Sequence, residues 1–211
     1  VKPMLQILRS GLLTIAMMAA ASGASAANRF SITYPAGMSS EPLTGRLLLI
    51  VAPVSEQEPR LMVAWDQDAV PFFGIDVSGW KPGEKKSIDG KAFGFPIRSI
   101  DDLPAGSYRV QAVLNRYETF VRSDGQRLEL PPDQGEGQVW SRKPGNLYSK
   151  PLSLRIGGMT LRPVSIVLDQ KIPAIEPFER LETPYVRYLR IRSERLSKFW
   201  GRDIFLGAWV R

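Results

Sequence analysis

Short apolar runs bounded by glycine and proline dominate the chain after about residue 28. Residues 30–34 alternate between apolar and polar and stop at Pro35, whereas residues 46–52 form an apolar run between Gly45 and Pro53. Both patterns predict β-strands, and no long stretch has the periodicity of an amphipathic helix. Further strands are predicted at residues 60–65, 152–156 and 163–168.

Two Asp-Gly pairs indicate tight turns. Asp89-Gly90 and Asp124-Gly125 are two-residue hairpin signals, and the second is predicted to join residues 117–123 to residues 126–130. Several short strands at this spacing favour an all-β fold, and more narrowly an immunoglobulin-like β-sandwich of two sheets over residues 27–171.

A tyrosine near the start of another predicted strand supports that fold class. The turn at residues 101–106 is rich in Asp, Pro and Gly and leads into an apolar stretch that reaches Leu114. Immunoglobulin-like domains use a tyrosine in this position to tie a corner, with its ring in the core and its hydroxyl bonded to the upstream backbone. We therefore predict a structural role for Tyr108 rather than a ligand-binding one.

The start of the chain has the three parts of a secretory signal peptide. Lys2 and Arg9 precede an apolar run at residues 12–21, which is followed by Ala24-Ser25-Ala26. We predict a signal peptide over residues 1–26, because the apolar run is shorter than the roughly 20 residues that cross a bilayer. An uncleaved membrane anchor is the alternative. Cleavage predicts a periplasmic or secreted protein with no membrane partner, and the lack of cysteine excludes a lipid-modified Cys and disulfide bonds.

Basic residues outnumber acidic ones, which raises the question of a nucleic-acid partner. The formal net charge is +7, and removal of Lys2 and Arg9 with the signal still leaves a basic chain. The dense basic segment lies at residues 187–202, where basic residues alternate with apolar ones. This alternation is typical of the solvent face of a half-buried strand, so we predict no nucleic-acid partner.

The composition also limits catalysis. The chain contains no histidine and no Gly-x-Ser-x-Gly segment, so neither a Ser-His-Asp arrangement nor a nucleophile elbow can be built from it. Zinc sites made of His or Cys are excluded as well. The acidic pairs Asp66/Asp68 and Asp101/Asp102 are predicted to form turns rather than to act as glycosidase acids or calcium ligands. We therefore expect no catalytic residue, no metal, no cofactor and no enzyme activity from this chain alone.

Aromatic rings are the remaining candidates for a binding site. Most of the large rings are expected in the core, because they dominate core energetics when buried. Trp80 and Trp140 lie in segments rich in Gly and Pro, where a ring can remain exposed. We predict these two residues as candidates for stacking on a polysaccharide.

Two segments resemble a known group of proteins. They are "LELPPDQGEGQVWSRKPGNLYSKP" at residues 128–151 and "RYLRIRSERLSKFWGRDIFLGAWVR" at residues 187–211. Both resemble the N-terminal part of exported bacterial esterases in which an all-β domain precedes an α/β-hydrolase domain, and the resemblance extends from about Phe30 to Arg211. It implies that the Pro-rich residues 172–184 are a linker and that residues 185–211 begin the hydrolase domain.

The last segment carries the strongest implication. By the same resemblance, residues 188–192 are a leading strand, residues 196–201 a connector and residues 204–210 the next strand of a hydrolase sheet. This last strand is apolar on both faces, which requires a layer above and a layer below it. The catalytic residues of such an esterase would follow Arg211, so we predict a fragment truncated before its catalytic domain.

Two functions follow from these observations. The first is a non-catalytic N-terminal β domain of an exported esterase or hydrolase, whose partner is the missing hydrolase domain in cis. Its mark is the apolar strand at residues 204–210. The alternative is a stand-alone secreted carbohydrate-binding module that recognises a polysaccharide through Trp80 or Trp140.

Overall fold

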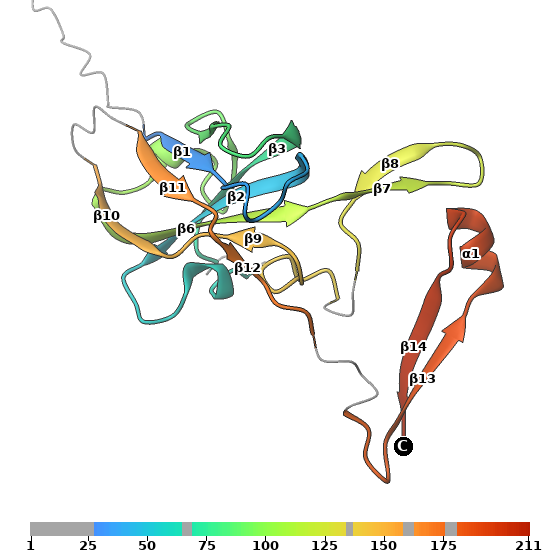
Figure 1. Cartoon of the computed structure of the whole chain (residues 1–211). Helices are drawn as coiled ribbons and strands as arrows, with labels where there is room; N and C mark the ends of the chain where they lie inside the picture. The colour runs from blue at the N-terminus through green and yellow to red at the C-terminus, as the bar shows by residue number, and fades with distance from the viewer. Residues whose placement is uncertain (1–27, 65–68, 134–136, 158–162, 176–180) are drawn as a thin grey trace, which may run out of the picture.

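The computed structural model describes residues 28–64, 69–133, 137–157, 163–175 and 181–211. Strands are the predominant regular structure in these segments, so the predicted all-β class is confirmed (Figure 1). The strands are β1 (Phe30–Thr33), β2 (Leu43–Pro53), β3 (Phe72–Trp80), β4 (Lys86–Ile88), β5 (Phe93–Phe95), β6 (Gly106–Arg116), β7 (Glu118–Val121), β8 (Arg127–Leu130), β9 (Leu147–Tyr148), β10 (Leu152–Ile156), β11 (Val164–Val167), β12 (Gln170–Lys171), β13 (Arg187–Arg192) and β14 (Phe205–Val210). The helix α1 (Glu194–Trp200) connects the last two strands.

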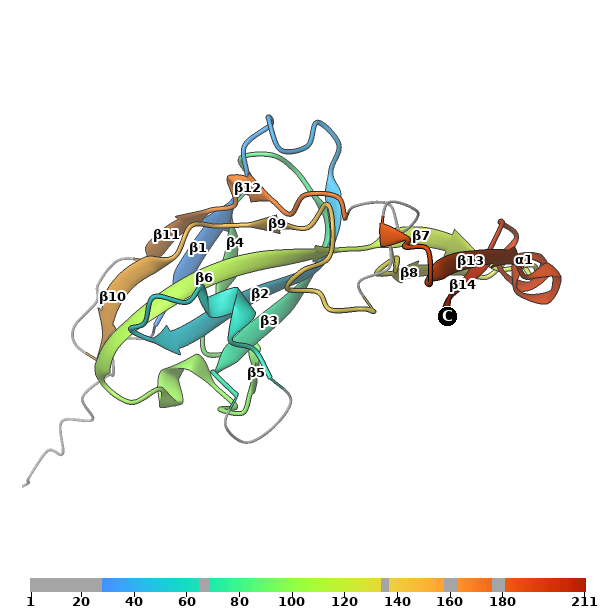
Figure 2. The same cartoon turned by 90° about the horizontal axis from the view of Figure 1, so that it is seen from below.

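The strands of the described segments form a seven-stranded sheet, here called the larger sheet, a three-stranded sheet, here called the smaller sheet, and two separate two-stranded sheets. The larger sheet has the order β12-β9-β6-β2-β3-β5, and β10 also pairs with β6, whereas the smaller sheet has the order β11-β1-β4. The long strands β2 and β6 pair antiparallel from Gly45–Arg116 to Pro53–Tyr108. The two-stranded sheets β7–β8 and β13–β14 extend to the same side of the body that the larger and the smaller sheet form (Figure 2).

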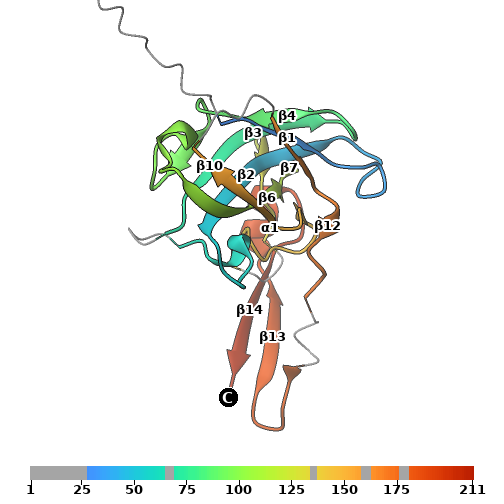
Figure 3. The ribbon, with the colours of Figure 1, turned by 90° about the vertical axis from the view of Figure 1, so that its left-hand side faces the viewer.

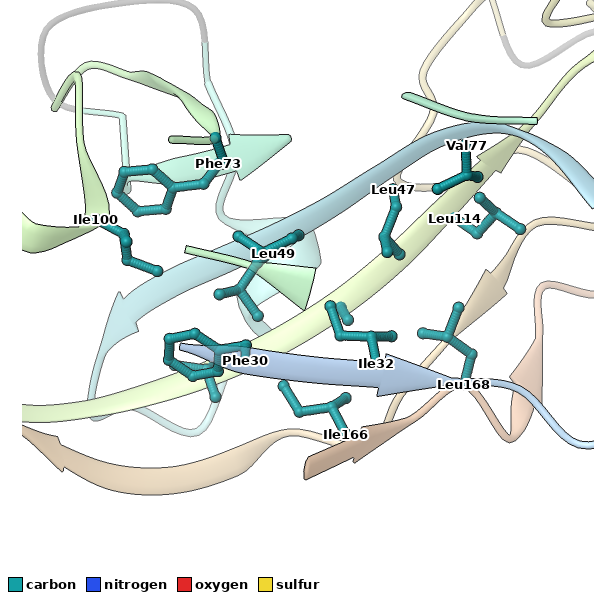
Figure 4. Packing of buried hydrophobic residues seen from close by; sticks show 14 of the residues in the cluster. Phe30, Ile32, Leu47, Leu49, Phe73, Val77, Ile100, Leu114, Ile166 and Leu168 are labelled. Atoms are coloured by element: carbon teal, nitrogen blue, oxygen red, sulfur yellow. The ribbon is translucent and has the colours of Figure 1, made fainter. Parts of the chain in front are cut away.

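The main core lies between the larger and the smaller sheet. Leu47, Leu49 and Val51 alternate along β2 and belong to the same buried cluster as Phe30 and Ile32 of β1. Figure 4 shows side chains from both sheets meeting in this layer. The smaller sheet therefore covers one face of β2 and gives residues 30–34 their alternating pattern.

The opposite face of the larger sheet is covered by connecting segments. Ile50 and Ala52 of β2 and Val113 of β6 are buried on that face, and Met62 and Val63 pack against them. Because both faces of β2 are covered, both sets of alternate residues must be apolar. This requirement explains the continuous apolar run in the sequence of β2.

The prediction of a strand at residues 60–65 was wrong. A 3₁₀-helix, η1 (Pro59–Leu61), occupies its start, and the rest of the described segment is not a strand, while Trp65 lies outside the described residues. The proline that begins η1 fixes a helical backbone φ and has no N–H to donate. The Arg60 N–H donates to the side-chain oxygen of Gln111 at 2.9 Å. Apolar residues in this segment therefore cover β2 instead of pairing with it.

Other predicted strands are confirmed, and so is the role of the tyrosine in β6. Residues 30–34, 152–156 and 163–168 contain β1, β10 and β11. The Tyr108 hydroxyl donates to the upstream carbonyl oxygen of Pro104 at 2.8 Å, and its ring packs against the main core. This bond ties the turn before β6 to the strand itself.

The Asp124-Gly125 turn joins β7 and β8, as predicted, although the loop is longer than the two residues expected. The Arg122 N–H donates to the carbonyl oxygen of Gln126 at 2.9 Å, which leaves residues 123–125 as the loop. Gly125 has a φ of 84°, in the left-handed region that favours glycine. A type I turn followed by a left-handed glycine is a common hairpin connection of this length.

The Asp89-Gly90 pair forms a turn, but the predicted hairpin was wrong. The Ala92 N–H donates to the carbonyl oxygen of Asp89 at 2.9 Å. The strands on either side, β4 and β5, belong to different sheets and do not pair. The turn therefore carries the chain from the smaller sheet to the larger one.

Tyr34 supplies a prediction about stability at alkaline pH. Its buried hydroxyl donates to the carbonyl oxygen of Trp80 at 2.6 Å, and burial, with the negative charge of Glu84, raises the pKa of Tyr34. The folded state therefore disfavours the phenolate, so stability falls as the pH rises above the unfolded pKa of about 10. We expect Tyr34→Phe to lower the free energy of unfolding by about 1 kcal/mol at pH 8. Above pH 10, the free energy of unfolding should fall less steeply with pH in this variant than in the unchanged chain.

Urea denaturation at the two pH values measures both effects. The control is Tyr185→Phe, since the Tyr185 side chain is exposed. Equal pH dependence in the two variants would contradict the role given to Tyr34.

Candidate functional site

The expectation that Trp80 exposes its ring was wrong. Trp80 is 0% exposed and lies in the main core. Its indole N–H donates to the carbonyl oxygen of Glu84 at 2.9 Å, and the ring of Tyr34 meets it edge to face at a centroid distance of 4.9 Å. The turn after β3 folds back and accepts the hydrogen bond of the indole N–H. The Gly- and Pro-rich segment therefore forms a turn that covers the Trp80 ring instead of a loop that leaves it exposed. Trp80 is not accessible for stacking on a sugar.

Trp140 remains half-buried and packs on the second face of the larger sheet. Its ring lies 6.1 Å from that of Phe72, and the guanidinium of Arg60 lies 4.4 Å from the ring centre of the neighbouring Tyr148. These contacts hold the aromatic side chains against β2 and β6. Of the two tryptophans predicted as ligand-binding residues, only Trp140 is partly exposed.

Exposed large hydrophobic residues are concentrated in the segment from Arg187 to Val210, here called the ribbon, which projects from the body (Figures 1 and 3). β13 and β14 pair antiparallel with Arg187 opposite Val210 and Arg192 opposite Phe205. Opposed residues in an antiparallel pair lie on the same face of the sheet. One face, here called the aliphatic face, therefore carries Leu189, Ile191, Leu206, Ala208 and Val210, with Arg187 at its end.

The aliphatic face is uncovered. The exposed fractions are 48% for Leu189, 61% for Ile191 and 55% for Leu206. The basic residues of β13 are exposed as predicted, but the expectation of a half-buried strand was wrong because its apolar residues are exposed too. Exposed contiguous apolar surface of this kind marks a site of protein or membrane contact or a liability for aggregation.

The other face of the ribbon is aromatic and basic. The rings of Tyr188 and Trp209 lie 5.2 Å apart, and the guanidinium of Arg190 lies 3.9 Å from the ring centre of Phe205. Gly207 makes room for this packing, since a Cβ there would lie 2.0 Å from the Tyr188 hydroxyl oxygen. The two faces of the ribbon thus differ in chemistry.

Ion pairs lie at each of the two ends of the ribbon. Arg192 contacts Asp203 and Glu194, each at 2.7 Å, and hydrogen bonds to these two carboxylates raise its pKa. At the other end, the backbone N–H of Tyr188 and then the guanidinium of Arg187 lower the pKa of Glu182. These charges are solvent-exposed, so each pair adds little to stability. Their effect is to fix the charged side chains of the ribbon in defined positions.

The β7–β8 hairpin, residues 118–130, forms an arm that holds α1. The ring of Phe120 meets that of Trp200 at 5.7 Å, and the guanidinium of Arg202 lies 4.9 Å from the ring centre of Phe120. The Ser123 N–H donates to the carbonyl oxygen of Phe199 at 2.9 Å. The arm therefore connects the ribbon to the body through side-chain and backbone contacts.

The sequence of α1 explains where it begins and ends. The Ser193 hydroxyl accepts a hydrogen bond from the Leu196 N–H at 3.4 Å and caps the start, while Gly201 ends the helix in a left-handed conformation. The buried Ser197 hydroxyl accepts from the Ile204 N–H at 2.9 Å. The strand, connector and strand expected over residues 188–210 are therefore present.

Within the described segments, no group of three or more acidic residues lies close enough together to hold a metal ion. The Asp101 N–H donates to the Ser99 hydroxyl at 3.3 Å in the turn before β6, whereas Asp66 and Asp68 lie outside the described residues. Among the described helices, none has the length and hydrophobicity needed to span a bilayer.

Comparisons with protein-family models, with curated proteins and with solved structures found no match to this chain. The site must therefore be interpreted from its own geometry. That geometry offers two surfaces of the kind predicted from the sequence, the uncovered ribbon and the half-buried Trp140.

The contact between arm and ribbon yields a second prediction. Replacing Phe120 by Ala removes the ring that faces Trp200, a contact worth about 0.5–1.5 kcal/mol. We expect amide hydrogens of α1 to exchange several-fold faster in Phe120→Ala, while those of β2 and β6 keep their protection. Hydrogen-exchange mass spectrometry measures both.

Thr119→Ala is the matched control, because Thr119 lies next to Phe120 on the opposite, exposed side of β7. If α1 exchanges at the same rate in Phe120→Ala, Thr119→Ala and the unchanged chain, the arm does not hold the helix.

Proposed function

We propose that this chain is the non-catalytic N-terminal β domain of an exported hydrolase, and that its ribbon is the surface on which the catalytic domain is built. The observation that carries the proposal is the uncovered aliphatic face of the ribbon, with Ile191 61% and Leu206 55% exposed. Strands with apolar residues on both faces are typical of α/β sheets, where layers of helices cover them.

Energetics favour a partner for the ribbon. A two-stranded sheet standing alone is marginally stable in water, and stable sheets need more strands or a packed layer. Here α1 and the arm supply contacts at the end of the ribbon where α1 lies. Further strands and covering helices from a catalytic domain would remove the exposed apolar area from water, which is the main driving force for such packing.

The arm gives the β domain a specific task in this arrangement. It reaches from the end of β6 to α1, which lies between the two strands of the ribbon in the sequence. A domain built on the ribbon would therefore be held at a fixed place beside the body. In this proposal the β domain positions the catalytic domain and supplies no reacting group.

The rest of the proposal extends the sequence predictions. The body is proposed to be an immunoglobulin-like sandwich, which the Tyr108 hydroxyl bond to Pro104 supports. Export through a signal peptide at residues 1–26 remains a proposal, since these residues lie outside the described part. The linker is proposed for residues 172–184, although Ile172 is buried and its N–H donates to the carbonyl oxygen of Asn146 at 2.9 Å. Ile172 therefore packs with the body.

The alternative is a stand-alone secreted carbohydrate-binding module. The partly exposed Trp140 is the observation that favours it. Trp140→Ala would then abolish the retardation of the chain in affinity gels that contain the recognised glycan. A chain that migrates alike in gels with and without a panel of cell-wall and plant polysaccharides would argue against this alternative.

The exposed aliphatic face makes a direct prediction about solution behaviour. Leu189 and Leu206 are diagonal neighbours on that face. Replacing both by Thr introduces side chains with a high β-strand propensity and removes exposed apolar area. We expect the double variant Leu189→Thr/Leu206→Thr to self-associate less than the unchanged chain, and removal of residues after Pro184 to have the same effect. Light scattering over a range of protein concentrations measures this.

Val54→Thr is the control, because Val54 is 62% exposed but lies in a loop of the body. If Val54→Thr and the ribbon variant change self-association equally, the ribbon is not a special surface.

The hydrolase origin is tested separately. We expect the chain alone to cleave no chromogenic ester above background, because it offers no imidazole base. The coding sequence after codon 211 is expected to continue in frame to a Gly-x-Ser-x-Gly segment. Ester turnover by the pure chain would overturn the non-catalytic role, and a stop codon directly after Arg211 would overturn the two-domain arrangement.

A further inference from the structure

A cleft of about 210 Å³ lies at the root of the arm, and its lining includes neither a residue of the ribbon nor Trp140. Residues from β2, from β3, from the junction of β6 with β7 and from β8 surround it. They are Thr44, Gly45, Asp76, Val77, Ser78, Tyr117 and Glu129. The cleft therefore combines parts of the body with the base of the arm.

Backbone geometry, rather than flexible side chains, shapes this cleft. The pairing of β2 with β3 is irregular between Leu43 and Gly45. Gly45 lies so close to β6 that a Cβ would be 2.1 Å from the carbonyl oxygen of Asn115, so no larger residue fits. The Tyr117 N–H donates to the carbonyl oxygen of Thr44 at 2.8 Å and fixes the other wall. A site built on paired strands keeps its shape without a ligand.

The lining offers both donors and acceptors of hydrogen bonds. Hydroxyls come from Thr44, Ser78 and Tyr117, and carboxylates come from Asp76 and Glu129. The Thr44 hydroxyl oxygen already accepts from the Gly79 N–H at 3.1 Å, which leaves its hydrogen to donate. Burial, with the charge of Asp76, raises the pKa of Tyr117, so its hydroxyl remains protonated.

The charges of the lining narrow the class of ligand. Two carboxylates disfavour an anion. Asp76 is paired with Arg46 at 2.9 Å, which leaves Glu129 as the carboxylate without such compensation in the lining. One exposed carboxylate is a poor site for a free cation, whereas charged acceptors and hydroxyl donors around a phenol ring suit a neutral polyhydroxylated molecule.

We propose that this cleft binds one ring of a neutral saccharide, with Tyr117 as a wall and with Asp76 and Glu129 accepting hydrogen bonds from sugar hydroxyls. The proposal does not depend on a catalytic domain, and it places sugar binding at a different site from Trp140. In a two-domain hydrolase, such a site would hold a glycan chain beside the catalytic domain.

Saccharide titration of the whole mature chain tests the proposal. The probes are glucose, mannose, galactose, N-acetylglucosamine and short oligomers of each, and the readouts are calorimetry and saturation-transfer NMR. We expect at least one probe to bind, and Glu129→Gln to weaken its binding about tenfold, because a hydrogen bond to a charged acceptor is replaced by a neutral one. Tyr117→Phe keeps the ring and loses the donor, so it should weaken binding less than Tyr117→Ala.

Two controls locate the site. Glu56→Gln changes an exposed carboxylate in a distant loop and Trp140→Ala removes the other candidate, and both should leave the affinity unchanged. The absence of binding by every probe overturns the proposal, and so does binding that is lost in Trp140→Ala but kept in Glu129→Gln. Preferential binding of lysine amide or guanidinium over the sugars would assign the cleft to cations instead. None of these outcomes depends on the self-association of the ribbon variants, so this proposal and the proposed function fail separately.

Discussion

The pairing of β2 with β6 is the interaction on which the rest of the structure depends. These two strands lie side by side at the centre of the larger sheet, and both of their faces are buried. Central strands of this kind exclude water from their backbone hydrogen bonds, which makes those bonds costly to break. The smaller sheet, the covering segments and the arm are all placed by reference to this pair. A substitution that disrupts this pairing would therefore displace the elements that carry the surfaces described above.

Much of the fold could be predicted from the sequence, because strands with one or two buried faces leave a direct pattern of apolar residues. That pattern located β1, β2, β10 and β11, and the chemistry of tight turns located the arm. Tyr108 could be assigned because a corner needs one bond between its hydroxyl and a nearby carbonyl. Local signals suffice where the stabilising contact is local in sequence.

Other features could not be predicted, since they depend on contacts between distant segments. Residues 60–64 have the composition of a strand, but their role as a cover is set by Gln111, far along the chain. Trp80 follows the same rule, because Tyr34, 46 residues earlier in the chain, packs against its ring and donates to its carbonyl oxygen. The cleft at Tyr117 combines four separate segments and left no signal in any one of them. The ribbon could be recognised because the apolar residues of both faces of its last strand lie in one short stretch of sequence, residues 204–210.

One residue, Tyr117, separates the end of β6 from the start of β7. A central strand and the projecting arm are therefore almost a single continuous rod, anchored at one end in the interior and carrying α1 at the other. A torque applied to the helix would be transmitted along this rod to the middle of the sheet, whereas a long, pliable loop would absorb it. A domain packed on the ribbon would therefore be mechanically coupled to the central strands of the larger sheet.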